Sequence, residues 1–438
     1  MKSIFLFLCL FLAVSVWSTD KLDYTPCKVL TEKDGLLHWE LAEAYRDHHS
    51  SFGREKILDV SKIKNPQVLN AFPEDLYRDD TADASVMVLF HGKNWSFNSK
   101  TPVLLVHGAG DDPNRGWVHP YSLTTPESVP EAAEGFMQRF SKAGFPVFAI
   151  AFSHHHGCNY KQAEQIHNAI QIIKRKTNAS KVHLLAHSKG NCAASIYVCG
   201  GKDVNPELFG FLSPFKKDVD KYIQIGPGNK GIDIIFRYYL GNVYSLSNKL
   251  SSPVCFQKAV YYGMWTDFYE KDIYKANPGK EIGNYFPGQC QLVNNLVDDG
   301  LDFSSYSYTP IDFNMTMKAC YYGGTTMYVQ AYGIEHSMKE GGYTIKKINE
   351  RGMDPSVSLI NIYGTNPVIQ EIDLGFIKIP IGVSDHPSDG LVYSHSASYI
   401  KGHLVRGAKL TAQKAFNLNH FGIAMKAEVF IWLESLLD

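Results

Sequence analysis

The chain of 438 residues has no excess of charge of either sign, because 43 lysines and arginines stand against 44 aspartates and glutamates. A protein without a basic surplus has little with which to neutralise phosphates, so the composition excludes nucleic acid as a partner. The sequence also contains no internal repeat, no low-complexity linker and no block of like charges. Hydrophobic residues make up 45% and charged residues 20% of the chain, a balance that excludes disorder, collagen and coiled coils and indicates a globular core.

Long hydrophobic runs are absent after the N-terminus, so no later segment is predicted to span a membrane. The first three residues include Lys2, and an apolar run from Ile4 to Trp17 follows them, which is short for a bilayer span. A positive start, a short apolar run and small residues after it are typical of a secretory signal peptide. We therefore predict a signal peptide over residues 1–18, cleavage after Ser18 and a secreted, extracellular protein.

Secretion would expose the cysteines to oxidation and the asparagines to glycosylation. Of eight cysteines, Cys9 belongs to the predicted signal peptide, which leaves an odd number. Disulfides of unspecified pairing are predicted among the others, with at least one thiol left over: Cys27, Cys158, Cys192, Cys199, Cys255, Cys290 and Cys320. Three Asn-x-Ser/Thr sequons are candidates for N-glycosylation: Asn94, Asn178 and Asn314.

Short apolar runs alternate with amphipathic segments from residue 101 onwards. The alternation predicts strands over 103–106, 146–152, 182–186, 222–225, 357–363 and 404–412, and helices over 131–143, 161–176 and 192–198. This order is typical of an α/β fold, with a mostly parallel central sheet that carries helices on both faces. Residues 19–95 are predicted to form an N-terminal extension that contains a helix over 36–45.

The alternation breaks down between residues 229 and 356, where Tyr, Phe, Gly and Asn are frequent. This segment is either a loop-rich excursion with its own aromatic core or a cap over a site at the carboxyl edge of the sheet. Because long irregular insertions usually act as lids or binding loops, we predict a cap over 229–356. It would separate the first part of the core, 96–228, from the second part, 357–438.

The most informative motif is Ala186–Gly190, with the sequence AHSKG. It lies between a predicted strand and a predicted helix, where a G-x-S-x-G nucleophile elbow requires a sharp turn and small residues two positions before and after the serine. Ala186 and Gly190 meet this requirement. The turn would expose the Ser188 hydroxyl at the sheet edge, near the positive end of a helix. The alternative is an ordinary strand-to-helix turn in which Ser188 caps the helix.

With this motif the chain resembles the lipase branch of the α/β-hydrolase superfamily, in particular secreted class 2 triacylglycerol lipases with an Ala-His-Ser-x-Gly box. Three further stretches resemble family loops: VHGAG at 106–110 the oxyanion loop, SDGLV at 388–392 the acid loop and NHF at 419–421 the histidine loop. The order Ser, Asp, His is that of the fold. The resemblance covers 101–228 and 354–438, and it implies an α/β-hydrolase fold with an inserted cap and the hydrolysis of carboxylic esters.

The serine hydroxyl needs a base, and the base needs a carboxylate that orients it. The position of His420, after the last predicted strand and before a terminal helix, favours it as the base over His395, in a predicted helix, and His403, at a strand edge. The resemblance favours Asp389 as the acid. Asp385 is the alternative, because it belongs to the same rigid turn.

The oxyanion hole is expected to use backbone N–H groups. The resemblance implies that they belong to Ala109, after the third strand of the fold, and to Lys189, directly after the nucleophile. His107 is expected to shape this loop, and His187 is expected to point away from the reacting centre.

Neither a metal nor an organic cofactor is predicted for this chemistry. The run His154–His156 and the nearby Cys158 are zinc-ligating residue types, but consecutive residues converge poorly on one tetrahedral site, so we interpret the run as a polar loop near the pocket. Some lipases of the family bind calcium with a carboxylate just after the histidine, whereas Phe421 and Gly422 follow His420 here. Gly108–Asp111 is not a phosphate loop, because no Gly-Lys-Ser/Thr follows it.

Three functions are compatible with these motifs. The first is a secreted lipase or esterase, whose partners would be an ester or lipid substrate and, transiently, a lipid surface. The second is a polyester depolymerase or an acyltransferase, because fold and triad are the same in these enzymes. The third is an inactive lipid-binding protein on a hydrolase scaffold. Such proteins usually lose a triad member, and all three positions are filled here, which favours a hydrolase.

Overall fold

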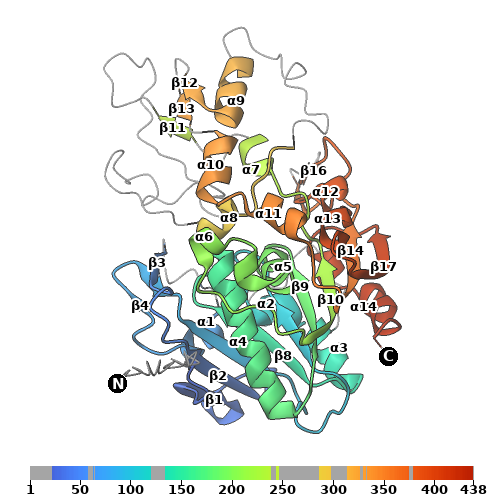
Figure 1. Ribbon diagram of the computed structural model, residues 1–438. Coiled ribbons are helices and arrows are strands. Elements are labelled where there is room, and N and C mark those ends of the chain that lie inside the picture. Colours follow the sequence, from blue (N-terminus) through green and yellow to red (C-terminus); the bar gives the residue numbers. More distant parts are fainter. Residues whose placement is uncertain are drawn as a thin grey trace, which may run out of the picture.

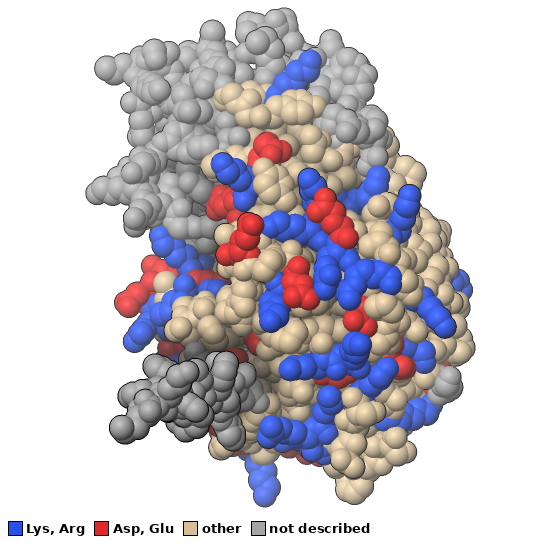
Figure 2. Space-filling model, viewed as in Figure 1, with Lys and Arg blue, Asp and Glu red and all other residues tan. Residues whose placement is uncertain are grey.

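The computed structural model is built around one large sheet with helices on both faces (Figure 1). None of its described helices combines the length and the apolar character that crossing a bilayer requires. In the face that Figure 2 shows, basic and acidic side chains lie side by side over the described residues. The structure describes residues 22–57, 63, 65–119, 134–237, 243–245, 286–296, 313–325, 329–331, 333–373 and 378–437.

Nine strands form the central sheet, in the order β1-β2-β6-β8-β7-β9-β10-β14-β17. The strands from β8 to β17 pair in parallel, and the pairs β1–β2, β2–β6 and β6–β8 are antiparallel. The parallel strands therefore share one carboxyl edge. The bounds are Lys28–Thr31 (β1), Leu41–Arg46 (β2), Val86–His91 (β6), Val103–Val106 (β7), Val147–Phe152 (β8), Val182–His187 (β9), Val219–Ile225 (β10), Ser358–Gly364 (β14) and Lys409–Phe416 (β17).

Helices and three small sheets complete the fold. The small sheets are β3-β5-β4 (Arg54–Lys56, Thr81–Asp83, Tyr77–Arg78), β11-β13-β12 (Val243–Ser245, Val329–Ala331, Gly324–Thr325) and β15-β16 (Gln370–Asp373, Lys378–Ile381). The α-helices are α1 Pro66–Ala71, α2 Pro113–Trp117, α3 Phe136–Lys142, α4 Asn159–Thr177, α5 Gly190–Val198, α6 Pro206–Phe209, α7 Ile234–Arg237, α8 Pro287–Cys290, α9 Phe313–Tyr322, α10 Ile334–Glu340, α11 Thr344–Arg351, α12 Ser394–Ala397, α13 Lys401–Leu404 and α14 Ala427–Glu434.

Residues that alternate along β7 face two separate hydrophobic cores. Leu104 and Val106 belong to the core that α4 and α5 cover, and Val103 and Leu105 belong to the core that α3 and α14 cover. A mostly parallel sheet buried on both faces produces such continuous apolar strands. The architecture is the α/β-hydrolase fold that the sequence predicts. The described helices α7, α9 and α10 of segment 229–356 lie together at the top of Figure 1.

The predicted helix over residues 36–45 is wrong, because Leu41–Arg46 forms β2. Its residues Leu, Ala, Glu and Arg favour helices, but the strand is paired on both sides, and tertiary pairing overrides weak propensity. The buried Glu43 is tolerated because Lys176 lies 2.9 Å from its carboxylate and the Tyr45 hydroxyl donates a hydrogen bond to it. The chain before residue 96 thus supplies three strands of the central sheet, which the sequence analysis did not predict.

The other predicted elements are mostly confirmed within one to three residues, but the end of the chain differs. The strand predicted over 404–412 is displaced, because α13 ends at Leu404 and β17 begins at Lys409. His403 therefore lies in a helix, whereas a strand edge was predicted. Of the helix predicted over 131–143, the structure has α3 from Phe136 to Lys142, and residues 131–133 lie outside the described residues.

The predicted disulfides are not found among the described cysteines, and Cys255 lies outside them. Five described cysteines have free thiols: Cys27, Cys158, Cys192, Cys199 and Cys320. Burial raises the pKa of the Cys192 thiol to about 12. Because the thiolate is the species that forms disulfides, such a thiol is protected from exchange.

A buried histidine in β9 predicts a loss of stability in mild acid. Burial and, secondarily, Lys221 lower the pKa of His183 to about 4, from the 6.5 of an ordinary histidine. As the pH falls from 7 to 5 the unfolded chain takes up this proton and the folded chain does not, so stability is lost. Between pH 7 and pH 5, we expect the free energy of unfolding of the native chain to fall by about 2 kcal/mol more than that of His183→Phe.

Urea unfolding at the two pH values measures this difference. The same substitution at His336, whose side chain is half exposed on α10, is the control for the exchange of an imidazole for a phenyl ring. An identical loss in His183→Phe and the native protein would contradict the prediction.

Candidate active site

Ser188 lies in a strained turn between β9, which ends at His187, and α5, which begins at Gly190. Its φ is 53°, in the left-handed region that residues with a side chain rarely adopt. The conformation is held by a hydrogen bond from Ser188 N to Ile225 O (3.0 Å) and by the Asn191 amide, which donates to the carbonyls of Ser188 (3.2 Å) and Ile225 (3.0 Å). Backbone strain of this kind persists only where the surroundings enforce it, and it is concentrated at functional sites.

Close backbone contacts explain why the residues around Ser188 are small. A Cβ on Gly190 would lie 2.5 Å from the carbonyl oxygen of His107 and 2.9 Å from that of Val106. A Cβ on Gly108 would lie 2.9 Å from Cβ of Ser188. The loop after β7 is therefore in direct contact with the elbow. The contacts involve backbone atoms, which cannot move aside to make room for a side chain.

We expect Gly190→Ala to lower the free energy of unfolding by about 1–3 kcal/mol and to reduce ester hydrolysis, because the added methyl group must push the loop after β7 away from Ser188. Urea unfolding and kcat measure the two effects. Gly228→Ala is the matched control, since its methyl group would meet nothing closer than 3.4 Å. Equal behaviour of the two variants would contradict the prediction.

Asp389 and His420 form a buried pair. Oδ2 of Asp389 lies 2.7 Å from Nδ1 of His420, and both side chains are at most 2% exposed. Oδ1 of Asp389 accepts hydrogen bonds from the backbone N–H groups of Leu391 (3.0 Å) and Val392 (2.8 Å). Because the carboxylate is fully partnered, its orientation towards the imidazole is fixed. Nε2 of His420 is buried, and no hydrogen-bond partner is found for it among the described residues.

The structure brings His420 and Ser188 to the same edge of the sheet. The imidazole packs on Gly226, where an added Cβ would lie 3.0 Å from Cε1 of His420. Gly226 follows Ile225, whose carbonyl oxygen accepts the Ser188 N–H. His187, next to Ser188, donates from Nε2 to the His420 carbonyl oxygen over 2.9 Å. His187 thus supports the backbone of His420, and its own pKa is lowered to about 3, mainly by burial.

Asp385 and His395, the alternative acid and base, make contacts with other residues. The Asp385 carboxylate accepts hydrogen bonds from the Tyr393 hydroxyl (2.8 and 3.0 Å) and lies 3.6 Å from Nη1 of Arg237. His395 lies in α12 and stacks on the ring of Tyr393, 5.5 Å away. The geometry therefore favours Asp389 and His420 over these alternatives.

A serine–histidine pair that no sequence motif predicted lies in and beside α5, behind the elbow. Oγ of Ser195, in the middle of α5, is 3.0 Å from Nε2 of His403, and both residues are buried. The same hydroxyl lies 3.1 Å from that of Tyr222, and the Gln224 amide lies 3.3 Å from His403 Nε2. Among the described residues, Nδ1 of His403 has no hydrogen-bond partner. This pair therefore lacks the orienting carboxylate that a base requires.

The backbone amides expected to form the oxyanion hole belong to Lys189, directly after Ser188, and to Ala109, directly after Gly108, on which an added Cβ would lie 2.9 Å from Cβ of Ser188. The loop after β7 is held by His107, which donates from Nδ1 to Gly108 O (2.9 Å), and by Arg115, which donates to Gly110 O (3.2 Å). No hydrogen bond from the backbone N–H of Ala109 or Lys189 to another described residue is found. Both groups remain available to an oxyanion, and their role stays a prediction.

Comparison with known proteins agrees with this geometry. Residues 100–256 match the class 2 lipase family. The match includes Ser188 and the loop after β7, and with the fold it identifies the chain as a carboxylic ester hydrolase. No curated protein matches the chain.

The solved structures similar to this hydrolase are remote. They include a monoglyceride lipase from Saccharomyces cerevisiae (14% identity over 80% of this chain and 93% of that chain, TM-score 0.37), a carboxyl esterase from Bacillus coagulans (11%, 81% and 95%, 0.36) and a lipase from Bacillus licheniformis (11%, 78% and 93%, 0.33). TM-scores this low add nothing to the topology and distances described above.

The side chain of Lys189 is buried in the hydrolase, although lysines are usually exposed. Its ammonium group donates to Oε1 of Gln162 over 2.5 Å, and burial lowers its pKa to about 8. Gly288 of α8 packs on it, because a Cβ there would lie 2.2 Å from Cε of Lys189. Lys189, which directly follows Ser188, thus links the turn at Ser188 to segment 229–356. The sequence motif did not predict this contact, because only the backbone N–H of Lys189 was expected to take part in the site.

The three consecutive histidines of the hydrolase have separate partners. His154 Nε2 donates to Lys56 O over 2.8 Å, and Nδ1 of His156 lies 3.1 Å from the Gln289 amide. His155 faces the backbone of Gly110, and its pKa is lowered to about 3, mainly by burial. No group of three or more metal-ligating side chains is found among the described residues.

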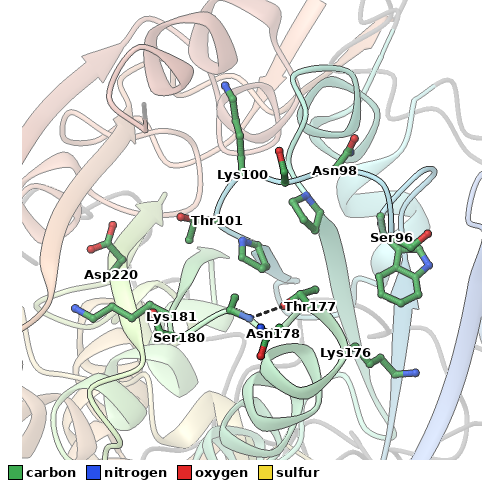
Figure 3. Close-up of a pocket in the computed structure, with 15 residues that line it drawn as sticks. Ser96, Asn98, Lys100, Thr101, Lys176, Thr177, Asn178, Ser180, Lys181 and Asp220 are labelled. Atoms are coloured by element: carbon green, nitrogen blue, oxygen red, sulfur yellow. Dashed lines mark hydrogen bonds between the residues drawn. The ribbon is translucent and has the colours of Figure 1, made fainter.

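A cavity of about 590 Å³ lies at the opposite edge of the sheet from Ser188 (Figure 3). It is lined by Thr101, Pro146 and Lys181, which precede β7, β8 and β9, whereas the elbow follows β9. The predicted glycosylation site Asn178 also lines it. This cavity is therefore separate from the candidate active site.

Proposed function

We propose that the chain is a secreted serine hydrolase that cleaves the carboxylic esters of lipids through an acyl-enzyme. One observation carries the proposal: the strained Ser188 lies at the same sheet edge as the buried pair of Asp389 and His420, whose Nε2 has no hydrogen-bond partner among the described residues. The class 2 lipase match over residues 100–256 and the aromatic segment 229–356 support a lipid as the substrate.

The reaction follows from this arrangement. Ser188 attacks the ester carbonyl while Nε2 of His420 takes its proton, and Asp389 holds the imidazole in the required tautomer and stabilises its positive charge. The N–H groups of Ala109 and Lys189 stabilise the oxyanion, each by about 3 kcal/mol. His420 then protonates the leaving alkoxide, and water cleaves the acyl-enzyme. Hydrogen bonds of an active site are often long before substrate binds, so a free Nε2 is compatible with this role.

A labelling and turnover experiment tests the proposal. We expect a fluorophosphonate probe to label the peptide that contains Ser188, and the purified protein to release acid from p-nitrophenyl esters and triglyceride emulsions across an acyl-length series. Labelling without turnover would indicate a lipid-binding protein. Turnover that passes the acyl group to added alcohols more readily than to water would indicate an acyltransferase, and turnover restricted to polyesters a depolymerase. Absence of labelling would reject the proposal.

Secretion has its own test. Asn94 and Asn178 are exposed in left-handed turns, with φ of 60° and 55°, so both would be accessible to glycan addition; the side chain of Asn314 lies outside the described residues. Expression in animal cells is expected to yield medium-borne protein that begins after Ser18 and loses mass on enzymatic deglycosylation. Protein that stays inside the cell with residue 1 intact would contradict secretion.

A further inference from the structure

The candidate acid lies in a loop that is packed against segment 229–356. This acid loop, residues 383–394, is closed by backbone hydrogen bonds from Val383 N to Gly390 O (2.9 Å) and from Asp389 N to Val392 O (3.1 Å). Its Val383 and Tyr393 are buried in a small core together with Ile234 of α7 and Leu296. The loop that contains Asp389 is therefore packed against α7.

Arg237, the last residue of α7, is a buried charged residue next to this small core. It is 2% exposed, and its Nη2 and Nε donate to the two carboxylate oxygens of Asp233 over 2.7 and 3.1 Å. The hydroxyl of Tyr321 in α9 donates to the same carboxylate over 2.7 Å. All three residues of this hydrogen-bonded group, Asp233, Arg237 and Tyr321, belong to segment 229–356.

The part of the Arg237 guanidinium that does not bind Asp233 contacts the acid loop. Nη1 of Arg237 lies 3.6 Å from Oδ2 of Asp385, and the guanidinium carbon lies 4.9 Å from the centre of the Tyr393 ring. The Tyr393 hydroxyl in turn donates to both oxygens of Asp385. Arg237 thus contacts the acid loop on both sides of Asp389, once before it in the chain and once after it.

A buried ion pair is a costly way to stabilise a protein. Removing such charges from water costs several kcal/mol for each ion, and well-packed apolar residues often stabilise as much or more. Arginine is suited to the alternative task of fixing geometry, because its planar fork binds a carboxylate with two bonds and stacks on an aromatic ring at the same time. The contacts of Arg237 use both properties.

We propose that Arg237 is a positioning residue of the hydrolase: through Asp385 and Tyr393 it fixes the acid loop in which Asp389 orients His420. The inference rests on the proposed function of this site. Arg237 touches none of the reacting groups, so it acts on the rate only through the geometry of the Asp389–His420 pair.

The test compares Arg237→Gln and Arg237→Lys with Arg351→Gln, which removes an arginine of α11 from an exposed ion pair with Asp203. For each variant we would measure kcat and KM on a p-nitrophenyl ester, the thermal unfolding midpoint and the far-downfield ¹H NMR signal of an imidazole N–H bound to a carboxylate. We expect Arg237→Gln to lower kcat by about 100-fold with little change in KM, since a small misplacement of a catalytic group costs about this much. Its downfield signal is expected to disappear.

Arg237→Lys is expected to recover part of kcat, because an ammonium group restores the charge beside Asp385 but not the fork. Arg351→Gln is expected to leave kcat and the signal unchanged. An Arg237→Gln protein with native kcat and an intact signal would overturn the proposal. If this variant fails to fold, Tyr393→Phe takes its place, since it removes only the hydroxyl that donates to Asp385; a lower kcat supports the proposal and an unchanged kcat overturns it.

The proposed function and the positioning role can fail separately. If Ser188→Ala abolishes activity and Arg237→Gln keeps it, only the role of Arg237 is rejected. If Ser188→Ala keeps activity, the proposed function is rejected, and the NMR signal still shows whether Arg237 controls the Asp389–His420 pair.

Discussion

Ser188→Ala is expected to lower kcat for ester hydrolysis by at least about 10⁴-fold while the protein stays folded. The methyl group cannot form the acyl-enzyme, and only the oxyanion donors and substrate binding would remain. The side chain is partly exposed at the sheet edge, and its loss removes no hydrogen bond that holds the elbow, since those bonds are made by the backbone of Ser188 and by Asn191. Initial rates with a p-nitrophenyl ester and a thermal unfolding curve measure the two properties.

Ser195→Ala is the matched control, because it removes a serine hydroxyl that lies 3.0 Å from Nε2 of a histidine, His403. We expect the free energy of unfolding of this variant to be lower by about 1–3 kcal/mol, because the buried His403 loses a hydrogen-bond partner. Its kcat is expected to remain close to the native value. If Ser195→Ala were inactive and Ser188→Ala active, the nucleophile would be Ser195 and the assignment of Ser188 would be wrong.

Asp389→Asn is expected to reduce kcat by about 10⁴-fold. Oδ1 accepts two backbone N–H groups, so the asparagine oxygen must stay there and its amide NH₂ must face Nδ1 of His420. Two donors would then oppose each other unless the imidazole moves its proton to Nε2. That tautomer has no lone pair with which to accept the proton of Ser188. A steady-state measurement of kcat on the folded variant tests this expectation.

Asp385→Asn separates the two carboxylates of the acid loop. This substitution leaves the hydrogen bond between Asp389 and His420 in place, and it weakens the contacts of Asp385 with Arg237, Tyr393 and His386. We expect a loss of kcat no larger than that of Arg237→Gln, and hence about 100-fold smaller than the loss in Asp389→Asn. If Asp385→Asn were the more damaging of the two, Asp385 would be the acid and the assignment of Asp389 would be wrong.

Local features of the candidate site could be predicted because their causes lie within a few residues. Val103–Val106 is apolar throughout and ends at His107-Gly108, which is sufficient for a buried strand followed by a loop. The elbow at Ala186–Gly190 could be located because a turn of this sharpness tolerates only small neighbours, and the contacts that a Cβ on Gly190 would make show the reason. The assignment of roles to these residues stays a prediction that the variants above will test.

The elements that were predicted wrongly depend on partners far away in the chain. Leu41–Arg46 contains helix-forming residues and becomes a strand only because β1 and β6 flank it. The disulfides predicted from the number of cysteines are not found among the described thiols, of which Cys192 is buried in α5 and Cys199 directly after it, and they stay a prediction for Cys255, which lies outside the described residues. No local pattern carries this information, because it is a property of which segments meet in the fold.

The alternation of strands and helices, the position of the elbow at Ser188 and the balance of charge could be read from the amino-acid order, because each follows from steric limits or composition within a short stretch of chain. Three features became visible in the fold alone: the contact of Asp389 with His420, the burial of Lys189 and the position of Arg237 against the acid loop. Asp385 and Asp389 are four residues apart in one turn, and they have different partners because Asp389 faces His420 at the carboxyl edge of the sheet, whereas Asp385 faces Arg237 of α7. Contacts between distant segments are selected by packing and desolvation over the whole fold, and these cannot be evaluated from neighbours in the chain.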